Sequence, residues 1–193
     1  MKSDKVKTTR EHLLITYAEH WHSSGTFLKL GIENRKGSYH QFLGSIVFTA
    51  FSLEAFLNHV GESLFASWPE LEMLTARGKV DLITEKLRIK VDYGSMPWQI
   101  IPEIIGVRNK IAHGKNELLK DERMLAADKY DEKMGEILLA QWQSYATRQK
   151  AEQAREKVEE LCKVIWSKTS FKEHELFQLS SQSGRAEFVP GEA

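Results

Sequence analysis

The strongest pattern in this 193-residue chain is a run of apolar side chains between residues 42 and 65. Steps of three and four residues connect most of them, as expected for one face of an α-helix. Further apolar side chains widen this face around most of the circumference, which indicates a central helix contacted on several sides. The helix is expected to end near Trp68 and Pro69, because a proline ring blocks helical continuation. The stepped positions are Leu43, Ile46, Ala50, Leu53, Leu57, Val60 and Leu64, and the widening ones are Phe42, Val47, Phe51, Phe56 and Phe65.

Weaker helical periodicity flanks the central helix. Only 4 Pro and 12 Gly interrupt the chain, which favours helices over a turn-rich β fold. We therefore expect an all-α, up-and-down bundle of about four or five helices, with a long central and a long C-terminal helix. Residues 1–170 are expected to form one domain, and residues 171–193 a tail that is a short hairpin or a disordered end. The other expected helices cover residues 9–30, 71–76, 79–89, 99–112 with Gly114 as C-cap, and 121–169 with a middle that is solvated or lightly packed.

The composition excludes several classes of protein. There are 27 Lys and Arg against 27 Asp and Glu, so a global basic field for nucleic acid is excluded and only a local patch is possible. The single cysteine, Cys162, excludes an intrachain disulfide and is expected to be packed in the core. Residues 43–57 are too few to span a bilayer, and residues 1–7 lack the apolar centre of a secretory signal. We expect a cytoplasmic protein without membrane contact.

Residues 107–114 read Val-Arg-Asn-Lys-Ile-Ala-His-Gly and hold the groups best suited to chemistry. Arg108 is a permanent cation whose planar fork fits phosphate oxygens. His113 can give or take a proton near neutral pH. Asn109 lies four residues before His113 on the same helical face, where it can orient the imidazole or bind a substrate. These three residues form the predicted site.

The spacing of Arg108 and His113 is not specific by itself. Arg35 and His40 show the same spacing in an expected loop, and we interpret that pair as a coincidence. A structural interpretation of the helical pair stays open, in which Arg108 pairs with a core carboxylate and His113 caps the helix end. The context favours a site, because Asn109 follows the arginine and an isoleucine-rich helix precedes it.

The arrangement Arg108-Asn109-x3-His113 resembles the R-x4-6-H motif of the HEPN superfamily, the higher eukaryote and prokaryote nucleotide-binding domain. Residues 51–58, Phe-Ser-Leu-Glu-Ala-Phe-Leu-Asn, look like the acidic and aromatic segment of several HEPN groups. The resemblance covers roughly residues 40–170 and implies an all-α bundle. Members with the motif are typically metal-independent endoribonucleases that act as homodimers. Many are toxins or defence effectors, and others have lost catalysis.

The chemistry of metal-free RNA cleavage agrees with this implication. A base must take the 2′-hydroxyl proton, an acid must protonate the leaving 5′-oxygen, and a cation must neutralise the phosphorane. One His113 cannot make both transfers in one step, so a two-fold homodimer would place one His113 on each side of the phosphate. The products would be a 2′,3′-cyclic phosphate and a 5′-hydroxyl. Lys110 and Lys115 would supply the local basic patch that binds RNA, and no metal or cofactor is expected.

The alternative function is a non-catalytic HEPN-like module that dimerises or binds a nucleotide or a protein. In either case a regulatory protein, such as an antitoxin, is a further expected type of partner.

Glu54 is the single formally charged residue between residues 41 and 61. On a central helix this carboxylate needs a buried partner, and Arg108 is the first choice. Glu54 would then hold the guanidinium in place, with Asn58 one turn further on as a second supporting group. A solvent-facing Glu54 is the open alternative. A metal site at Glu19 and His22 lacks further ligands.

Overall fold

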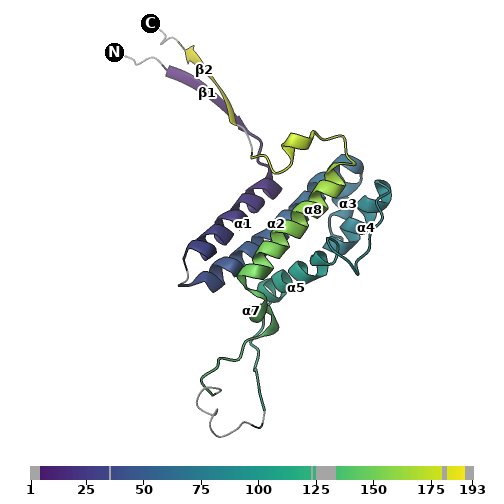
Figure 1. Cartoon of the computed structure of the whole chain (residues 1–193). Helices are drawn as coiled ribbons and strands as arrows, with labels where there is room; N and C mark the ends of the chain where they lie inside the picture. Colours follow the sequence, from purple (N-terminus) through teal and green to yellow (C-terminus); the bar gives the residue numbers. More distant parts are fainter. Residues whose placement is uncertain (1–4, 35, 123, 125–133, 180–181, 190–193) are drawn as a thin grey trace.

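The computed structural model describes residues 5–34, 36–122, 124, 134–179 and 182–189 (Figure 1). This part of the chain is mostly helical, with seven α-helices and one two-stranded sheet, so the expectation of a predominantly helical chain is confirmed. The helices are α1 (Thr16–Glu33), α2 (Ser38–Leu64), α3 (Trp68–Leu71), α4 (Ala76–Lys86), α5 (Ile100–Ala112), α7 (Gln141–Tyr145) and α8 (Arg148–Trp166), and the strands are β1 (Lys5–His12) and β2 (Gln182–Val189).

Helix α2 is the centre of the molecule, as its apolar pattern predicts. It contacts α1, α3, α4, α5 and α8. The helix ends at Leu64, earlier than expected, and Pro69 instead lies in the first turn of α3, where its missing N–H costs nothing. The fully buried side chains of α2 include Ile46, Ala50, Leu53, Phe56, Leu57 and Val60.

Gly61 allows a close approach between α2 and the indole of Trp68. A Cβ atom at residue 61 would lie 2.3 Å from the Trp68 ring, which is 1% exposed. The ring has no room to move, so we expect Gly61→Ala to lower the free energy of unfolding by about 1–3 kcal/mol. Urea denaturation measures this change.

Gly106 provides the matched control for that experiment. It lies inside α5, and a Cβ atom there would meet nothing within 4 Å. Gly106→Ala should therefore raise the free energy of unfolding by about 0.5–1 kcal/mol, since alanine is the better helix former. Equal stability of the two alanine variants would contradict the packing argument.

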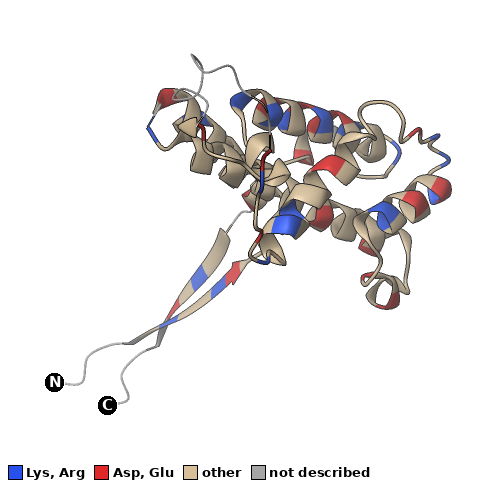
Figure 2. Cartoon of the chain, turned by 90° about the horizontal axis from the view of Figure 1, so that it is seen from below, with Lys and Arg blue, Asp and Glu red and all other residues tan. Residues whose placement is uncertain are grey.

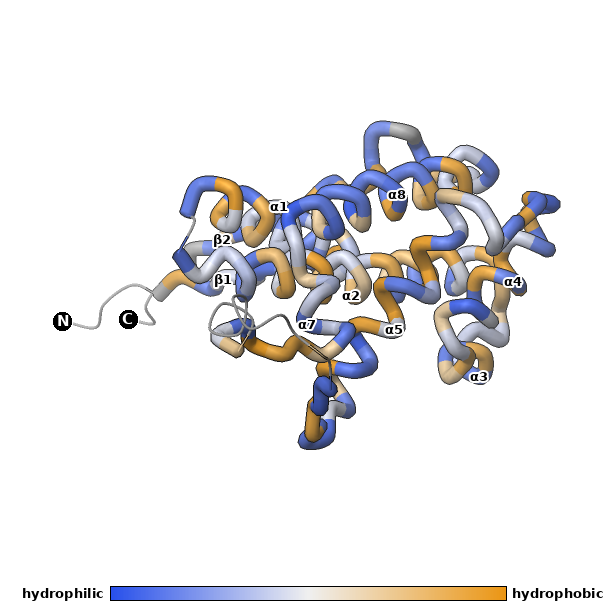
Figure 3. The backbone as a smooth tube through the Cα atoms, turned by 60° about the horizontal axis from the view of Figure 1, so that its bottom comes forward, coloured by the Kyte–Doolittle hydropathy of each residue, from blue (hydrophilic) through white to orange (hydrophobic). Residues whose placement is uncertain are grey.

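The expected single helix over residues 121–169 is wrong in its described part, where α7 and the long α8 are separate helices. Residues 123 and 125–133 of that expected helix lie outside the described residues. The side chain of Thr147 accepts a hydrogen bond from the Lys150 N–H at 3.2 Å and so caps the start of α8. In the middle of α8, Ala151 and Ala154 are fully buried against the rest of the fold, while the side chains of Arg148 and Glu152 are 60% and 44% exposed, so the packing there is partial. Helix α8 is amphipathic: Figure 3 colours most of its residues as hydrophilic, with hydrophobic residues at intervals.

The two strands form a ribbon that extends from one end of the helical part (Figure 1). They pair antiparallel, with Val6 opposite Phe188 and His12 opposite Gln182. Residues 9–12 therefore belong to β1, and the expected helix start at residue 9 is wrong. The expected hairpin within residues 171–193 is also wrong, because β2 pairs with β1. Each strand satisfies the backbone groups of the other, which no local periodicity reveals.

A short segment after α8 folds back onto the aromatic residues of the core. The Phe171 ring lies 4.5 Å from the Trp166 ring, and the Phe177 ring stacks on Trp21 at 4.2 Å. The Arg155 guanidinium also lies 3.9 Å from the centre of the Trp21 ring. These contacts anchor residues 171–177 to the helices.

His59 is half-buried in the same cluster, with ring centres 5.0 Å from Phe171 and 6.1 Å from Trp166. Burial lowers the pKa of His59 below its ordinary value of 6.5. The unfolded chain then binds the proton more tightly than the fold, so stability is complete above about pH 6.5 and falls as the pH drops toward the lowered pKa. We expect urea denaturation to show a lower free energy of unfolding at about pH 5.5 than at about pH 7.5.

His59→Phe keeps an aromatic ring in place but cannot be protonated, so its stability should depend less on pH. Some dependence is expected to persist, because burial also lowers the pKa of His20. An unchanged pH dependence in His59→Phe would show that His59 does not contribute.

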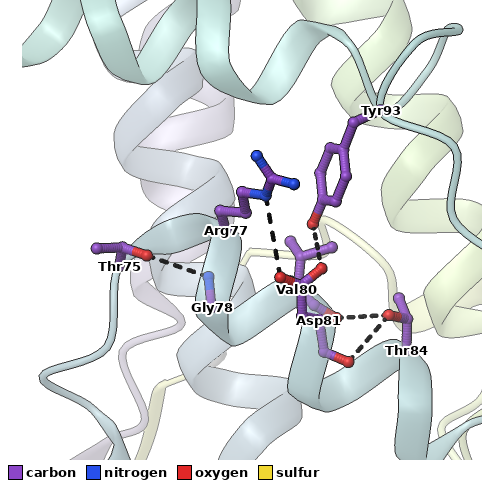
Figure 4. Close-up of polar contacts among 7 residues, drawn as sticks. All are labelled: Thr75, Arg77, Gly78, Val80, Asp81, Thr84 and Tyr93. Carbon is purple, nitrogen blue, oxygen red and sulfur yellow. Dashed lines mark hydrogen bonds and ion pairs between the residues drawn. The ribbon is translucent and has the colours of Figure 1, made fainter.

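The connection from α4 to α5 is held by a polar cluster (Figure 4). The Tyr93 hydroxyl donates to Asp81 Oδ1 at 2.6 Å, and the Arg77 guanidinium lies 4.3 Å from the centre of the Tyr93 ring. At the start of α4, the Gly78 N–H donates to the Thr75 hydroxyl at 3.1 Å. These contacts fix the chain that leads into α5, the helix that carries the Arg108 to His113 motif.

Among the described helices, α2 has the length and apolar composition that a membrane span requires. Half of its most apolar window is buried inside the fold, which is also the character of a core helix in a soluble protein. The finding is compatible with a soluble protein.

Candidate functional site

The site is built where the core-facing side of α5 meets α2. Arg108 forms an ion pair with Glu54, so the predicted partner of the central-helix carboxylate is confirmed. The two side chains are only 17% and 28% exposed, which weakens solvent screening of the pair. The alternative of a solvent-facing, unpaired Glu54 is therefore wrong.

The guanidinium of Arg108 is held on further sides. Its Nη1 donates to Asn109 Oδ1 at 2.7 Å, and its carbon lies 5.9 Å from the centre of the Phe51 ring. Its Nε is buried and has no hydrogen-bond partner among the described residues. Asn109 was expected to orient His113, but its side-chain oxygen instead accepts the hydrogen bond from Arg108. Sequence reasoning assigned Phe51 to the core and missed this contact.

His113 lies on the opposite, solvent-facing side of the same helix end. It is exposed and is itself the C-cap of α5, with its N–H donating to the Asn109 carbonyl at 2.9 Å. The expected C-cap at Gly114 is therefore displaced by one residue. At 100° per residue, Asn109, Lys110 and His113 share one face with Gly106, while Arg108 points toward α2. All four residues on that face are exposed.

The lysines predicted to bind RNA are both exposed. Lys110 lies on the His113 face of α5, and Lys115 follows in the segment after the helix. Elsewhere, basic and acidic side chains are interspersed over the described helices (Figure 2). A local basic contribution near His113 is thus consistent with a chain of zero net charge.

Asn58 does not join this cluster, although it is one helical turn beyond Glu54. Its Oδ1 accepts from Lys79 Nζ at 2.7 Å, and its Nδ2 donates to Glu72 Oε1 at 3.3 Å. Lys79 is buried, so Asn58 provides the polar partner that its ammonium group needs. The expected support of Arg108 by Asn58 is therefore wrong.

A second group of residues beside the motif was missed by sequence reasoning. The Tyr145 hydroxyl donates to Glu103 Oε2 at 2.9 Å, and Lys150 Nζ donates to the same oxygen at 3.2 Å. Burial, together with the hydrogen bond to Glu103, raises the pKa of Tyr145. This network joins α5, α7 and α8. The sequence feature that could have indicated this group is the aromatic pair Trp142 and Tyr145, which are three residues apart.

The remaining reactive side chains lie apart from the motif. Cys162 is fully buried, as expected, and burial raises the pKa of its thiol. The described residues contain no group of three or more His, Cys, Asp or Glu side chains that could hold a metal ion. Arg35, the partner of His40 in the coincidental spacing, lies outside the described residues.

Comparison with known proteins gives no match: no protein-family model, curated protein or solved structure matches this chain. On one side of α5, the Arg108 guanidinium is fixed and neutralised by Glu54. On the other side, the His113 imidazole is exposed, with the Asn109 amide and the Lys110 ammonium group on the same face. The imidazole is the group that can transfer protons near neutral pH.

Proposed function

We propose that this chain is a HEPN-like endoribonuclease that cleaves RNA without a metal ion, in an active site shared by two copies. The observation that carries the proposal is the exposed face of α5. Asn109, Lys110 and His113 lie there together, while the opposite side of the helix is fixed to α2 through Arg108 and Glu54. An exposed imidazole on a rigid helix end is free to meet a substrate and a second imidazole.

The reaction follows from the groups present. One His113 takes the proton of the 2′-hydroxyl, and the 2′-oxygen attacks the adjacent phosphorus. The bond from phosphorus to the 5′-oxygen breaks, and His113 of the second copy protonates that oxygen. A 2′,3′-cyclic phosphate and a 5′-hydroxyl result. Lys110 and Lys115 bind phosphates and supply positive charge near the phosphorane, while Arg108 holds the end of α5 through its ion pair with Glu54.

The wider proposal includes an up-and-down bundle of HEPN type, a homodimer, and a cytoplasmic toxin or defence role. A regulatory protein such as an antitoxin would block the activity by covering the His113 face of α5.

A second candidate function is a non-catalytic HEPN-like module that dimerises or binds a nucleotide or protein. The observation that favours it is the neutralisation of Arg108 by Glu54, with Arg108 Nη1 also engaged by Asn109. A guanidinium in this state offers less charge to a phosphorane than a free one.

The chemistry of the product distinguishes the two functions. End-labelled single-stranded RNA is incubated with the protein in excess EDTA, beside the same oligonucleotide with 2′-deoxyribose throughout. The ribonuclease should cleave only the RNA, in EDTA, and leave a 2′,3′-cyclic phosphate. Cleavage of the deoxy strand, or loss of cleavage in EDTA, would contradict the proposal. Dimerisation without any cleavage would favour the binding module.

A further inference from the structure

A pocket of about 390 Å³ lies between α5 and α7, beside the His113 face. Its volume is within the range of small-molecule sites. Gly106 and Lys110 of α5 line it together with Trp142 and Tyr145 of α7, and Glu103 and Glu117 add carboxylates. We infer that this pocket binds a nucleobase with an exocyclic amino group, as a subsite for the RNA strand. This inference rests on the proposed function.

The walls of the pocket are fixed before any ligand arrives. Tyr145 is bonded to Glu103, and Lys150 bonds the same carboxylate and lies 4.9 Å from the centre of the Tyr145 ring. The start of α7 is fixed as well, because the Ala140 N–H donates to the Gln143 side chain at 2.9 Å. A preformed wall loses little conformational freedom on binding.

Gly106 leaves open space on the α5 side of the pocket. Glycine is the poorest helix former after proline, yet it lies inside α5. A Cβ atom there would meet nothing within 4 Å, so no described neighbour requires the glycine. The missing side chain keeps the floor of the pocket open beside Trp142 and Tyr145.

The residues that line the pocket suit a nucleobase better than they suit other kinds of small molecule. Aromatic side chains stack on nucleobases, and a carboxylate such as Glu117 accepts hydrogen bonds from an exocyclic amino group. Lys110 follows Gly106 by one turn, and His113 lies about 10 Å along the helix axis from Gly106. A base in the pocket therefore places its phosphates toward Lys110 and His113. Uracil lacks the amino group and should bind less tightly than guanine, adenine or cytosine.

The test measures binding separately from cleavage. Calorimetric titration of the intact protein in EDTA with 5′-GMP and with 5′-UMP should show tighter binding of GMP. Trp142→Ala should weaken GMP binding by about 5- to 100-fold, the loss expected for one stacked base. Trp142→Phe should restore most of it. Gly106→Leu should weaken GMP binding at least about tenfold while the melting temperature stays equal or rises, since leucine is a better helix former.

Each outcome separates the subsite from the proposed function. Binding of GMP by a protein that cleaves no RNA would leave the subsite standing and overturn the ribonuclease. Cleavage of RNA by a protein that binds neither monophosphate, or equal binding of both, would overturn the subsite alone. Conversion of the chain to a monomer by Gly106→Leu would also overturn the subsite, because it would assign the pocket to the contact between copies.

Discussion

His113→Ala is expected to lower the rate of metal-independent RNA cleavage by about 100- to 10,000-fold, the usual contribution of a positioned acid or base. His113 is exposed at the end of α5, so its loss should change the free energy of unfolding by less than about 0.5 kcal/mol. The measurement is the initial rate of cleavage of labelled RNA in EDTA, with the melting temperature recorded for each variant.

His40→Ala is the matched control, because His40 is also exposed and also stands five residues after an arginine. It should cleave at the wild-type rate. Equal rates for His113→Ala and wild type would exclude His113 from the chemistry, and any cleavage would then belong to another group or a contaminant.

Mixed dimers test whether the active site is shared. In a dimer of one wild-type and one His113→Ala chain, only one imidazole remains in the common cleft. The cleavage rate should then be close to that of a dimer in which both chains carry His113→Ala, since a base and an acid are both needed in one step. A mixed dimer with half of the wild-type rate would instead show that each copy works alone.

Glu54→Ala is expected to lower the free energy of unfolding by about 2–4 kcal/mol. The substitution leaves the Arg108 guanidinium without its counter-charge in a site where only 17% of its side chain is exposed. Breaking a fully buried pair costs about 3–5 kcal/mol, and the partial exposure here reduces that figure. Urea denaturation of Glu54→Ala, Arg108→Ala and the double variant completes a double-mutant cycle, with an expected coupling of about 1–3 kcal/mol.

The exposed pair of Arg148 and Glu152 is the control for this cycle. Its side chains are 60% and 44% exposed, so its coupling should be about 0.3–0.5 kcal/mol. A coupling between Glu54 and Arg108 that is no larger than this would show that the ion pair does not fix α5 to α2. The structural role of Arg108 would then have to be abandoned.

Local patterns in the sequence were sufficient for the central helix and for the shared face of α5. The apolar stripe of α2 identifies the central helix because side chains three and four residues apart always share one helical face. The same rule places Asn109 and His113 on one face of α5. The lone charge of Glu54 in an apolar helix correctly predicted a buried partner, because an isolated carboxylate there would be costly.

Other features depended on neighbours that are distant in the sequence. Asn58 was expected to support Arg108, but Lys79 approaches it from α4 and takes its side-chain oxygen. The start of α8 is an exception, because the Thr147 hydroxyl accepts from the Lys150 N–H only three residues on; the expectation of one helix over residues 121–169 overlooked this local cap. Gly106 and Trp142, far apart in the sequence, line one pocket because α7 packs against α5.

The sequence alone therefore determined that the chain is mostly helical, which helix is central, and that Asn109 and His113 share one face of α5, because these depend on backbone geometry within a few residues. The tertiary structure decided that β1 pairs with β2, that Asn58 serves Lys79, and that α5 and α7 enclose a pocket. Hydrogen bonds and packing between remote segments form only when the whole core brings them into reach, and their specific partners are not encoded in local periodicity.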